Sequence, residues 1–200
     1  MSLEKFKELK LLGERPALDF INTVDWRGRE DTIDYLKDYA DLVEWAVLAK
    51  QITQSEAEEL REKAEKNPEK AAEAYHHTIK FREAAYRALV KTSFNEDTNQ
   101  EDEEVLNSEM HETFSNLTLN LREKQLELGE IGLDYILRLM VKDTVDLMTS
   151  DELDKVKRCS SEECGWLFID TSKNSSRKWC RMGGCGNRAK ARRYYNRSRQ

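Results

Sequence analysis

The sequence lacks any apolar segment long enough to cross a membrane. A bilayer-spanning helix needs roughly 20 consecutive, mostly apolar residues, and no run in this chain of 200 residues approaches that length. The first twelve residues alternate charged and apolar side chains, a pattern unlike that of a secretory signal peptide. We therefore expect a cytoplasmic protein without a membrane partner.

Side chains for acid–base or nucleophilic catalysis are also scarce. The chain has three histidines, of which His76 and His77 are neighbours that point about 100° apart on a helix. His111 is isolated, and no histidine stands at a recognisable spacing from a cysteine or from a pair of carboxylates. The sequence thus offers no nucleophile or base with an orienting partner, and we expect that the protein is not an enzyme.

The charge of the chain is unevenly distributed. The net charge is −6, but residues 155–200 contain 13 Lys and Arg against 3 Asp and Glu, which gives +10. Residues 1–154 then carry −16. This polarity is typical of an acidic body joined to a module that binds a polyanion. The alternative is a solvated basic tail that docks on the acidic body.

Helical periodicity dominates the first 150 residues. Proline is favoured in the first turn of a helix, so Pro16 and Pro68 each indicate a start. Thr53 and Glu56 have the spacing of a capping box, in which each side chain bonds the backbone amide of the other residue. The predicted helices cover residues 16–27, 32–47, 54–67, 68–94, 105–114 and 131–147.

Two segments between these helices have other patterns. Residues 95–104 are acidic and contain no apolar residue, which predicts a mobile connection. After residue 116 the period of the apolar residues changes to two on both sides of a Glu-Lys turn, which predicts a β-hairpin. The alternating residues are Leu117, Leu119, Leu121, Leu126 and Leu128. The predicted fold of residues 1–150 is therefore mainly α with a small β-hairpin.

The four cysteines carry the most specific signal. They lie within 27 residues as two C-x4-C pairs, Cys159 with Cys164 and Cys180 with Cys185. Two short loops that each present two thiolates suit one tetrahedral zinc ion, with bonds of about 2.3 Å. Two disulfides are an alternative, but cytosolic thiols are kept reduced; an iron–sulfur cluster also uses four cysteines, although paired symmetrical spacing favours zinc. Four thiolates leave no position for water, so we expect a structural ion.

The residues around the cysteines predict a small α+β zinc finger with two knuckles. Residues 166–169 form a strand-like run, residues 170–176 a polar turn and residues 177–180 a return strand. Residues 187–199 are predicted to form a basic helix about 20 Å long. The boundary falls near residues 150–156, so we expect an acidic domain of residues 1–150 that folds alone and a finger of residues 151–200.

Several motifs resemble a known pair of domains. Residues 164–174 (CGWLFIDTSKN), 177–182 (RKWCRM) and 185–190 (CGNRAK) resemble the CGNR zinc finger. Upstream, residues 18–23 (LDFINT) followed by Arg27 resemble the start of the ABATE domain that normally precedes this finger. One departure is Lys178, which stands where the family commonly has a second arginine and so loses a bidentate donor. The resemblance covers nearly the whole chain and implies a stress-induced transcription regulator that binds double-stranded DNA.

Eight cations of the finger are the candidate nucleic-acid contacts. They are Arg177, Lys178, Arg181, Arg188, Lys190, Arg192, Arg193 and Arg197. Phosphate contacts are expected to supply most of the affinity, with Arg188 or Arg192 reading bases. The alternatives are RNA binding with stacking on Trp166 or Trp179, and a thiolate switch that ejects zinc on oxidation.

The body has its own candidate site. Asp19, Asn22 and Arg27 are the best candidates for contacts with a small-molecule effector. The competing interpretation is capping and buried hydrogen bonding around the first helix. A homodimer is a further expected form of association.

Overall fold

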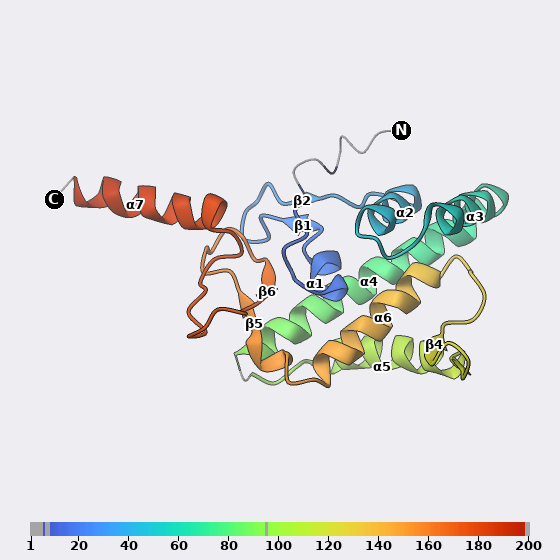
Figure 1. The fold of residues 1–200 in the computed structure, drawn as a ribbon. Helices are drawn as coiled ribbons and strands as arrows, with labels where there is room; N and C mark the ends of the chain where they lie inside the picture. The colour runs from blue at the N-terminus through green and yellow to red at the C-terminus, as the bar shows by residue number, and fades with distance from the viewer. Residues whose placement is uncertain (1–5, 7–8, 95, 199–200) are drawn as a thin grey trace.

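The structure, a computed structural model, describes residue 6, residues 9–94 and residues 96–198. Helices dominate this part of the chain, and the strands form three separate antiparallel pairs. A bundle of helices forms one end of the molecule, and the last helix projects from the other end (Figure 1). The predicted fold class is confirmed. Among the described residues, no helix combines the length and the apolar character that a membrane span requires.

Each of the first four helices begins at a local signal, although the second begins later than the apolar periodicity predicts. They are α1 (Pro16–Ile21), α2 (Tyr39–Leu48), α3 (Gln54–Lys66) and α4 (Pro68–Ser93). Both prolines occupy the first turn of their helix. The capping box before α3 is complete, because Thr53 N donates to Glu56 Oε2 at 2.6 Å and Glu56 N donates to Thr53 Oγ1 at 3.2 Å.

The predicted helix over residues 32–47 begins too early. Residues Ile33–Asp34 form strand β2, which pairs with β1 (Val24–Asp25), so the predicted helix over residues 16–27 is also too long. The Asp34 carboxylate is held by the guanidinium of Arg82 in α4, at 2.6 Å. The chain therefore stays extended here, and α2 starts only after Asp38, whose side chain caps the helix.

The predicted mobile connection over residues 95–104 is also partly wrong. Helix α5 (Gln100–Ser115) already begins within it, and Asn99 caps it by accepting a hydrogen bond from Asp102 N at 2.7 Å. The Asp102 side chain is buried and pairs with Arg87 of α4 at 2.5 Å. A polar segment is thus ordered by a cap and an ion pair. Residue 95 lies outside the described residues.

The predicted β-hairpin is confirmed. Strand β3 (Thr118–Asn120) pairs with β4 (Gln125–Glu127), and Leu119 stands opposite Leu126. The alternating leucines do not enter the core, because Leu119 is 61% exposed, Leu121 78% and Leu126 48%. Of these leucines only Leu128 is buried, and it lies in the segment that leads from β4 to α6 (Tyr135–Met148). The hairpin therefore presents an exposed apolar surface.

The finger pairs its strands differently from the prediction. Strand β6 (Leu167–Ile169) pairs with β5 (Val156–Arg158), which precedes the cysteines, and the predicted return strand over residues 177–180 is absent. The backbone amide of Arg177 donates to the Asp170 carboxylate at 3.0 Å. It therefore stabilises the turn after β6 and does not bond a neighbouring strand. A π-helical turn, η3 (Met182–Gly186), then leads into α7 (Asn187–Arg197). The predicted last residue of this helix, Arg199, lies outside the described residues.

Body and finger share one apolar core. Every residue of β6 is buried, and β6 packs in the same cluster as Leu18 and Ile21 of α1. Strand β5 lies against α4 (Figure 1). This packing argues against the expectation that residues 1–150 fold alone, because the finger covers apolar residues of the body.

Candidate metal centre

The four cysteines converge on one point. Their sulfur atoms all lie within 4.8 Å of one another, and all four side chains are buried. Cys164 Sγ and Cys185 Sγ each lie 3.7 Å from Cys180 Sγ. A tetrahedron with metal–sulfur bonds of about 2.3 Å has edges of about 3.8 Å, so the spacing fits one zinc ion. Disulfide sulfurs would be about 2.05 Å apart, and the four cysteines are free.

The ligands are held by backbone bonds of the finger. Cys159 follows β5 directly, and its amide donates to Trp166 O at 2.8 Å, which continues the β5–β6 ladder. The amide of Cys180 points at Cys159 Sγ at 3.5 Å. Cys185 lies in η3, immediately before α7. The predicted ligand set, Cys159, Cys164, Cys180 and Cys185, is thus brought together as one zinc site that also fixes the start of α7.

The candidate nucleic-acid contacts fall into two groups. Arg177 is engaged within the finger, where Nη2 donates to Cys180 O at 2.7 Å and the guanidinium lies over the Phe168 ring. Arg188 donates to Cys185 Sγ at 3.0 Å and stacks on the ring of Trp26 at 4.5 Å. The remaining cations are exposed: Lys178, Arg181, Lys190, Arg192, Arg193 and Arg197.

Comparison with known families agrees with this architecture. Residues 155–198 match the CGNR zinc finger. Residues 14–151 match the ABATE family, which is described as "Putative stress-induced transcription regulator". The chain belongs to the ABATE family. Comparison with the curated proteins gives no match. The resemblance drawn from the sequence motifs is confirmed, and the chain is a zinc-binding member of this family of regulators.

A loop of the ABATE domain lies directly on the first zinc knuckle. Arg27 N donates to Cys164 O and Gly28 N donates to Glu163 O, both at 3.2 Å. A Cβ atom on Gly28 would lie 2.0 Å from Glu162 O, and one on Gly165 would lie 2.7 Å from Arg27 Cβ. Glycine is needed at both positions because the two backbones approach so closely.

Asn22 joins the ABATE domain to the sheet of the finger. Its side chain donates to Leu167 O at 2.8 Å and accepts from Leu167 N at 2.9 Å, and the residue is 1% exposed. The amide thus imitates a neighbouring strand along the free edge of β6. The side-chain oxygen and the side-chain nitrogen of Asn22, which was a candidate for contacts with a small molecule, therefore both bond within the chain.

Arg27 also serves the interior of the ABATE protein. Its guanidinium makes two bonds to Glu83 of α4, at 2.6 and 3.1 Å, and lies over the Tyr86 ring at 4.0 Å. Arg82 contacts the same carboxylate at 2.9 Å. Burial opposes ionisation of Glu83, but the bonds and charges of these two arginines lower its pKa below the ordinary value. Arg27 is thus committed to an internal ion-pair network.

Asp19 is the third candidate ligand residue and also bonds internally. Its carboxylate accepts a hydrogen bond from Gly13 N at 2.8 Å. Burial raises the pKa of Asp19 from 3.8 to about 6, against the effect of the backbone hydrogen bonds from Gly13 and Leu12. Asp19, Asn22 and Arg27 therefore do not form one open site, and none of them lines the cavity beside the four cysteines.

The raised pKa of Asp19 predicts a pH-dependent stability. Between pH 3.8 and about 6 the folded chain keeps a proton that the unfolded chain has lost. The contribution of Asp19 to the free energy of unfolding is thus fully present below the lower value and is lost as the pH rises through the upper one. Its size is at most about 3 kcal/mol. We expect Asp19→Asn to gain stability relative to the wild type as the pH rises to about 7.

Urea unfolding of the two proteins at a series of pH values measures this difference. The comparison cancels the titration of the zinc ligands, which both proteins share. A difference between the two free energies of unfolding that does not change with pH would contradict the assignment.

No pattern in the sequence marks Trp26 as a site residue. Its φ is +58°, a left-handed conformation that is an outlier for a bulky side chain. In this conformation the ring contacts the guanidinium of Arg29 at 4.9 Å and that of Arg188 at 4.5 Å. Trp26, a residue of the ABATE domain with a strained backbone, thus contacts Arg188 in the first turn of α7.

Asp170 was another missed residue, although Asp-Thr-Ser is a sequence typical of a side-chain-closed turn. Its carboxylate accepts bonds from Lys157 Nζ at 2.5 Å, Ser172 Oγ at 2.6 Å and Arg177 N at 3.0 Å. The bonds from Lys157 and Ser172 hold the pKa of Asp170 well below its ordinary value. The residue organises the turn that leads from β6 to Cys180.

Proposed function

We propose that this protein is a DNA-binding transcription regulator whose zinc site presents α7 to the duplex, while the ABATE domain senses a ligand or mediates association. A cytoplasmic location and a role without enzymatic activity are part of this proposal. The observation that carries it is an exposed, basic helix anchored at one end by a metal centre. The family description supports the regulatory role.

Helix α7 has the exposure that a nucleic-acid contact requires. None of its residues is buried, and it extends away from the rest of the chain (Figure 1). Its 11 residues span about 17 Å, which is comparable to the width of a DNA groove together with its flanking phosphates. Lys190, Arg193 and Arg197 are exposed along it. This position does not support the alternative that the helix docks on the acidic body.

The placement of the arginines assigns them different tasks. Arg188 already bonds a zinc ligand and stacks on Trp26, so we assign it to anchoring the helix rather than to reading bases. Arg192 pairs with Glu163 at 3.0 Å, but both side chains are exposed and such a pair contributes little stability. Arg192 is therefore available for DNA. Phosphate contacts of the cations on several faces supply most of the affinity.

A salt series on duplex DNA tests the proposal. The affinity of the wild type should fall steeply with salt, because each phosphate contact releases a counterion. Arg192→Ala with Arg193→Ala should reduce the slope of log K against log salt by about 2. Arg61→Ala with Lys66→Ala removes the same charge from α3, which lies at the other end of the molecule from α7, and should leave the slope unchanged (Figure 1).

Two results would overturn the DNA proposal. If the protein did not bind duplex DNA even at low salt, the proposal of a DNA-binding regulator would be wrong. Tighter binding to single-stranded RNA would favour RNA binding, which the exposure of Tyr194 (77%) and Tyr195 (56%) beside the arginines of α7 supports through base stacking. Trp166 is buried and Trp179 half-buried, so the two tyrosines are better placed for base stacking than these tryptophans.

The other parts of the proposal have their own support. Homodimer formation is supported by the exposed leucines of the β3–β4 hairpin, and sedimentation measures it. A redox switch is the remaining alternative, in which peroxide releases zinc from the thiolates; titration of the zinc-loaded protein with peroxide decides it.

A further inference from the structure

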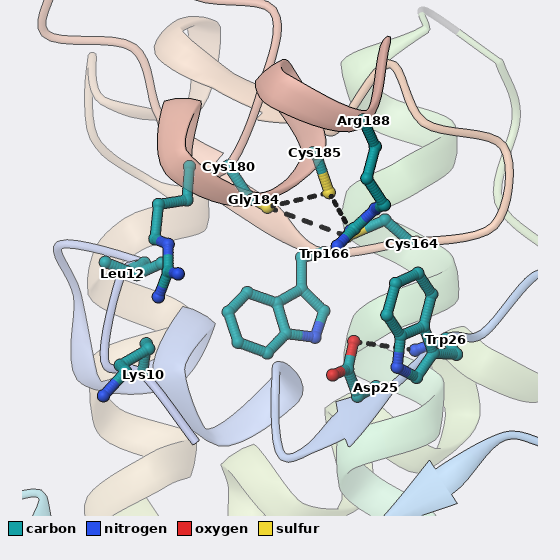
Figure 2. A pocket seen from close by; sticks show the side chains of 11 residues that line it. Lys10, Leu12, Asp25, Trp26, Cys164, Trp166, Cys180, Gly184, Cys185 and Arg188 are labelled. Carbon is teal, nitrogen blue, oxygen red and sulfur yellow. Dashed lines mark hydrogen bonds between the residues drawn. The ribbon is translucent and has the colours of Figure 1, made fainter. Parts of the chain in front are cut away.

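A cavity of about 420 Å³ lies between the finger and the body, beside the zinc centre. Lys10 enters its wall from the N-terminal segment, Asp25 and Trp26 from β1 and the loop after it, and Trp166, Arg181 and Arg188 from the finger (Figure 2). Sites for small molecules commonly have volumes of about 300–1,000 Å³ and lie where two units meet. This cavity meets both conditions.

The charges on the Lys10 side of the cavity favour a monoanion. Lys10, Arg181 and Arg188 are cationic, and Asp25 is the acidic residue among the lining side chains. Four thiolates around a divalent zinc ion add a formal charge of about −2 at one wall, where Arg188 already faces Cys185 Sγ at 3.0 Å. Lys10 lies on the other side of Trp166 from Asp25 and Arg188 (Figure 2). A single negative charge at the Lys10 side is compensated, whereas a dianion would be repelled more strongly by the metal centre.

The aromatic walls favour a planar ring. Trp166 lies at the centre of the view in Figure 2 and lines the cavity with the small part of its side chain that is exposed (6%). Its Nε1 donates to Val24 O at 3.0 Å, which fixes the orientation of the indole. Trp26 forms the wall next to Arg188. Two indoles with fixed orientations can pack on the faces and edges of an aromatic ligand.

We propose that this cavity binds a small aromatic carboxylate, with the ring against Trp166 and the carboxylate towards Lys10 and Arg181, and that the ligand acts on α7 through Arg188. Arg188 connects the cavity to α7, because it lies in the first turn of this helix and donates a hydrogen bond to Cys185, one of the zinc ligands. It also stacks on Trp26, which lines the cavity. A ligand beside Trp26 changes the surroundings of this contact. The effect on α7 rests on the proposed function, whereas binding in the cavity does not.

Nuclear magnetic resonance of the zinc-loaded full chain tests the proposal, with benzoate as the probe. We expect saturable shifts of the indole signals of Trp26 and Trp166, with a dissociation constant on the order of 1 mM, and a shift of the Arg188 amide. Trp45 is fully buried in α2 and should not shift. Benzamide, which has the ring without the charge, and acetate, which has the charge without the ring, should each bind at least about tenfold more weakly.

Variants separate the cavity from general electrostatics. Lys10→Ala with Arg181→Ala should weaken benzoate binding by about tenfold or more. Lys190→Ala with Arg193→Ala removes the same charge from exposed positions of α7 outside the cavity and should leave binding unchanged. The proposal is overturned by the absence of a saturable shift, by equal binding of benzamide, or by equal effects of the two double variants. Since no DNA is present, a failure here is distinct from a failure of duplex binding.

Discussion

Loss of the zinc ion is expected to unfold the finger and to lower the stability of the whole chain. Cys180→Ser should abolish stoichiometric zinc binding and shift the thermal unfolding of the full chain to a much lower temperature. Structural zinc contributes about 10–16 kcal/mol of apparent free energy in isolated fingers. Whole domains are stable by only about 5–15 kcal/mol, so the lost contribution is comparable to the total.

The physical reason lies in the small size of the finger. The segment between the first and last cysteine has 27 residues, too few to bury an adequate core of their own. The metal holds together β5, the knuckles and the start of α7, which are joined by few strand bonds. Without it, β6 loses the restraint that keeps its three residues packed on the body. The damage therefore spreads beyond the finger.

Metal analysis and circular dichroism melting check this expectation, with and without a chelator. Ser160→Ala is a matched control, because Ser160 is exposed, lies next to a ligand and contributes no sulfur. It should keep one zinc ion per chain and the melting temperature of the wild type. A Cys180→Ser protein with full zinc content and unchanged melting would show that the four sulfurs do not form one site.

Features encoded by neighbouring residues were the ones that the sequence predicted well. The capping box of Thr53 and Glu56 spans four residues, and each zinc knuckle spans six. Their geometry follows from local backbone preferences and ligand chemistry. The two prolines and the alternation of the hairpin leucines are signals of the same short range.

Features that depend on distant residues were missed. The pairing of β5 with β6 crosses the first knuckle, and the bonds of Asn22 to Leu167 join residues 145 positions apart. The ion pair of Arg87 with Asp102 orders a segment that composition alone describes as mobile. Polar contacts of this kind leave no periodicity, so neither apolar patterning nor charge counts can reveal them.

Because of these contacts, we expect that the change of composition near residue 150 does not mark two independently folding cores. The motif LDFINT places Leu18 and Ile21 under the finger and Asn22 on the edge of β6. The loop after β1 then bonds the first knuckle through Arg27 N and Gly28 N. The ABATE domain therefore supplies apolar and hydrogen-bonding contacts that stabilise the zinc finger. A loss of structure in either part is expected to destabilise the other.

A chain truncated after Ser150 is consequently expected to be much less stable than the whole protein. It loses β5 and β6, which cover apolar residues of α1 and α4. Val156, Trp166, Leu167, Phe168 and Ile169 are buried side chains removed by this cut. Burial of one such side chain contributes about 1.5–3 kcal/mol, so the sum is comparable to the stability of a domain. The truncated chain should expose apolar surface and melt without a sharp transition.

Truncation after Ala189 provides the control for this cut. It keeps all four zinc ligands and the bond of Arg188 to Cys185, and it removes only residues whose described side chains are exposed. Its melting should match that of the full chain, because no buried contact is lost. Binding of a dye that reports exposed apolar surface, together with thermal unfolding, compares the two truncated chains. If residues 1–150 melted as sharply and at the same temperature as the whole protein, the apolar contacts between β6 and α1 would contribute nothing to the body, and the two parts would be separable domains that only touch.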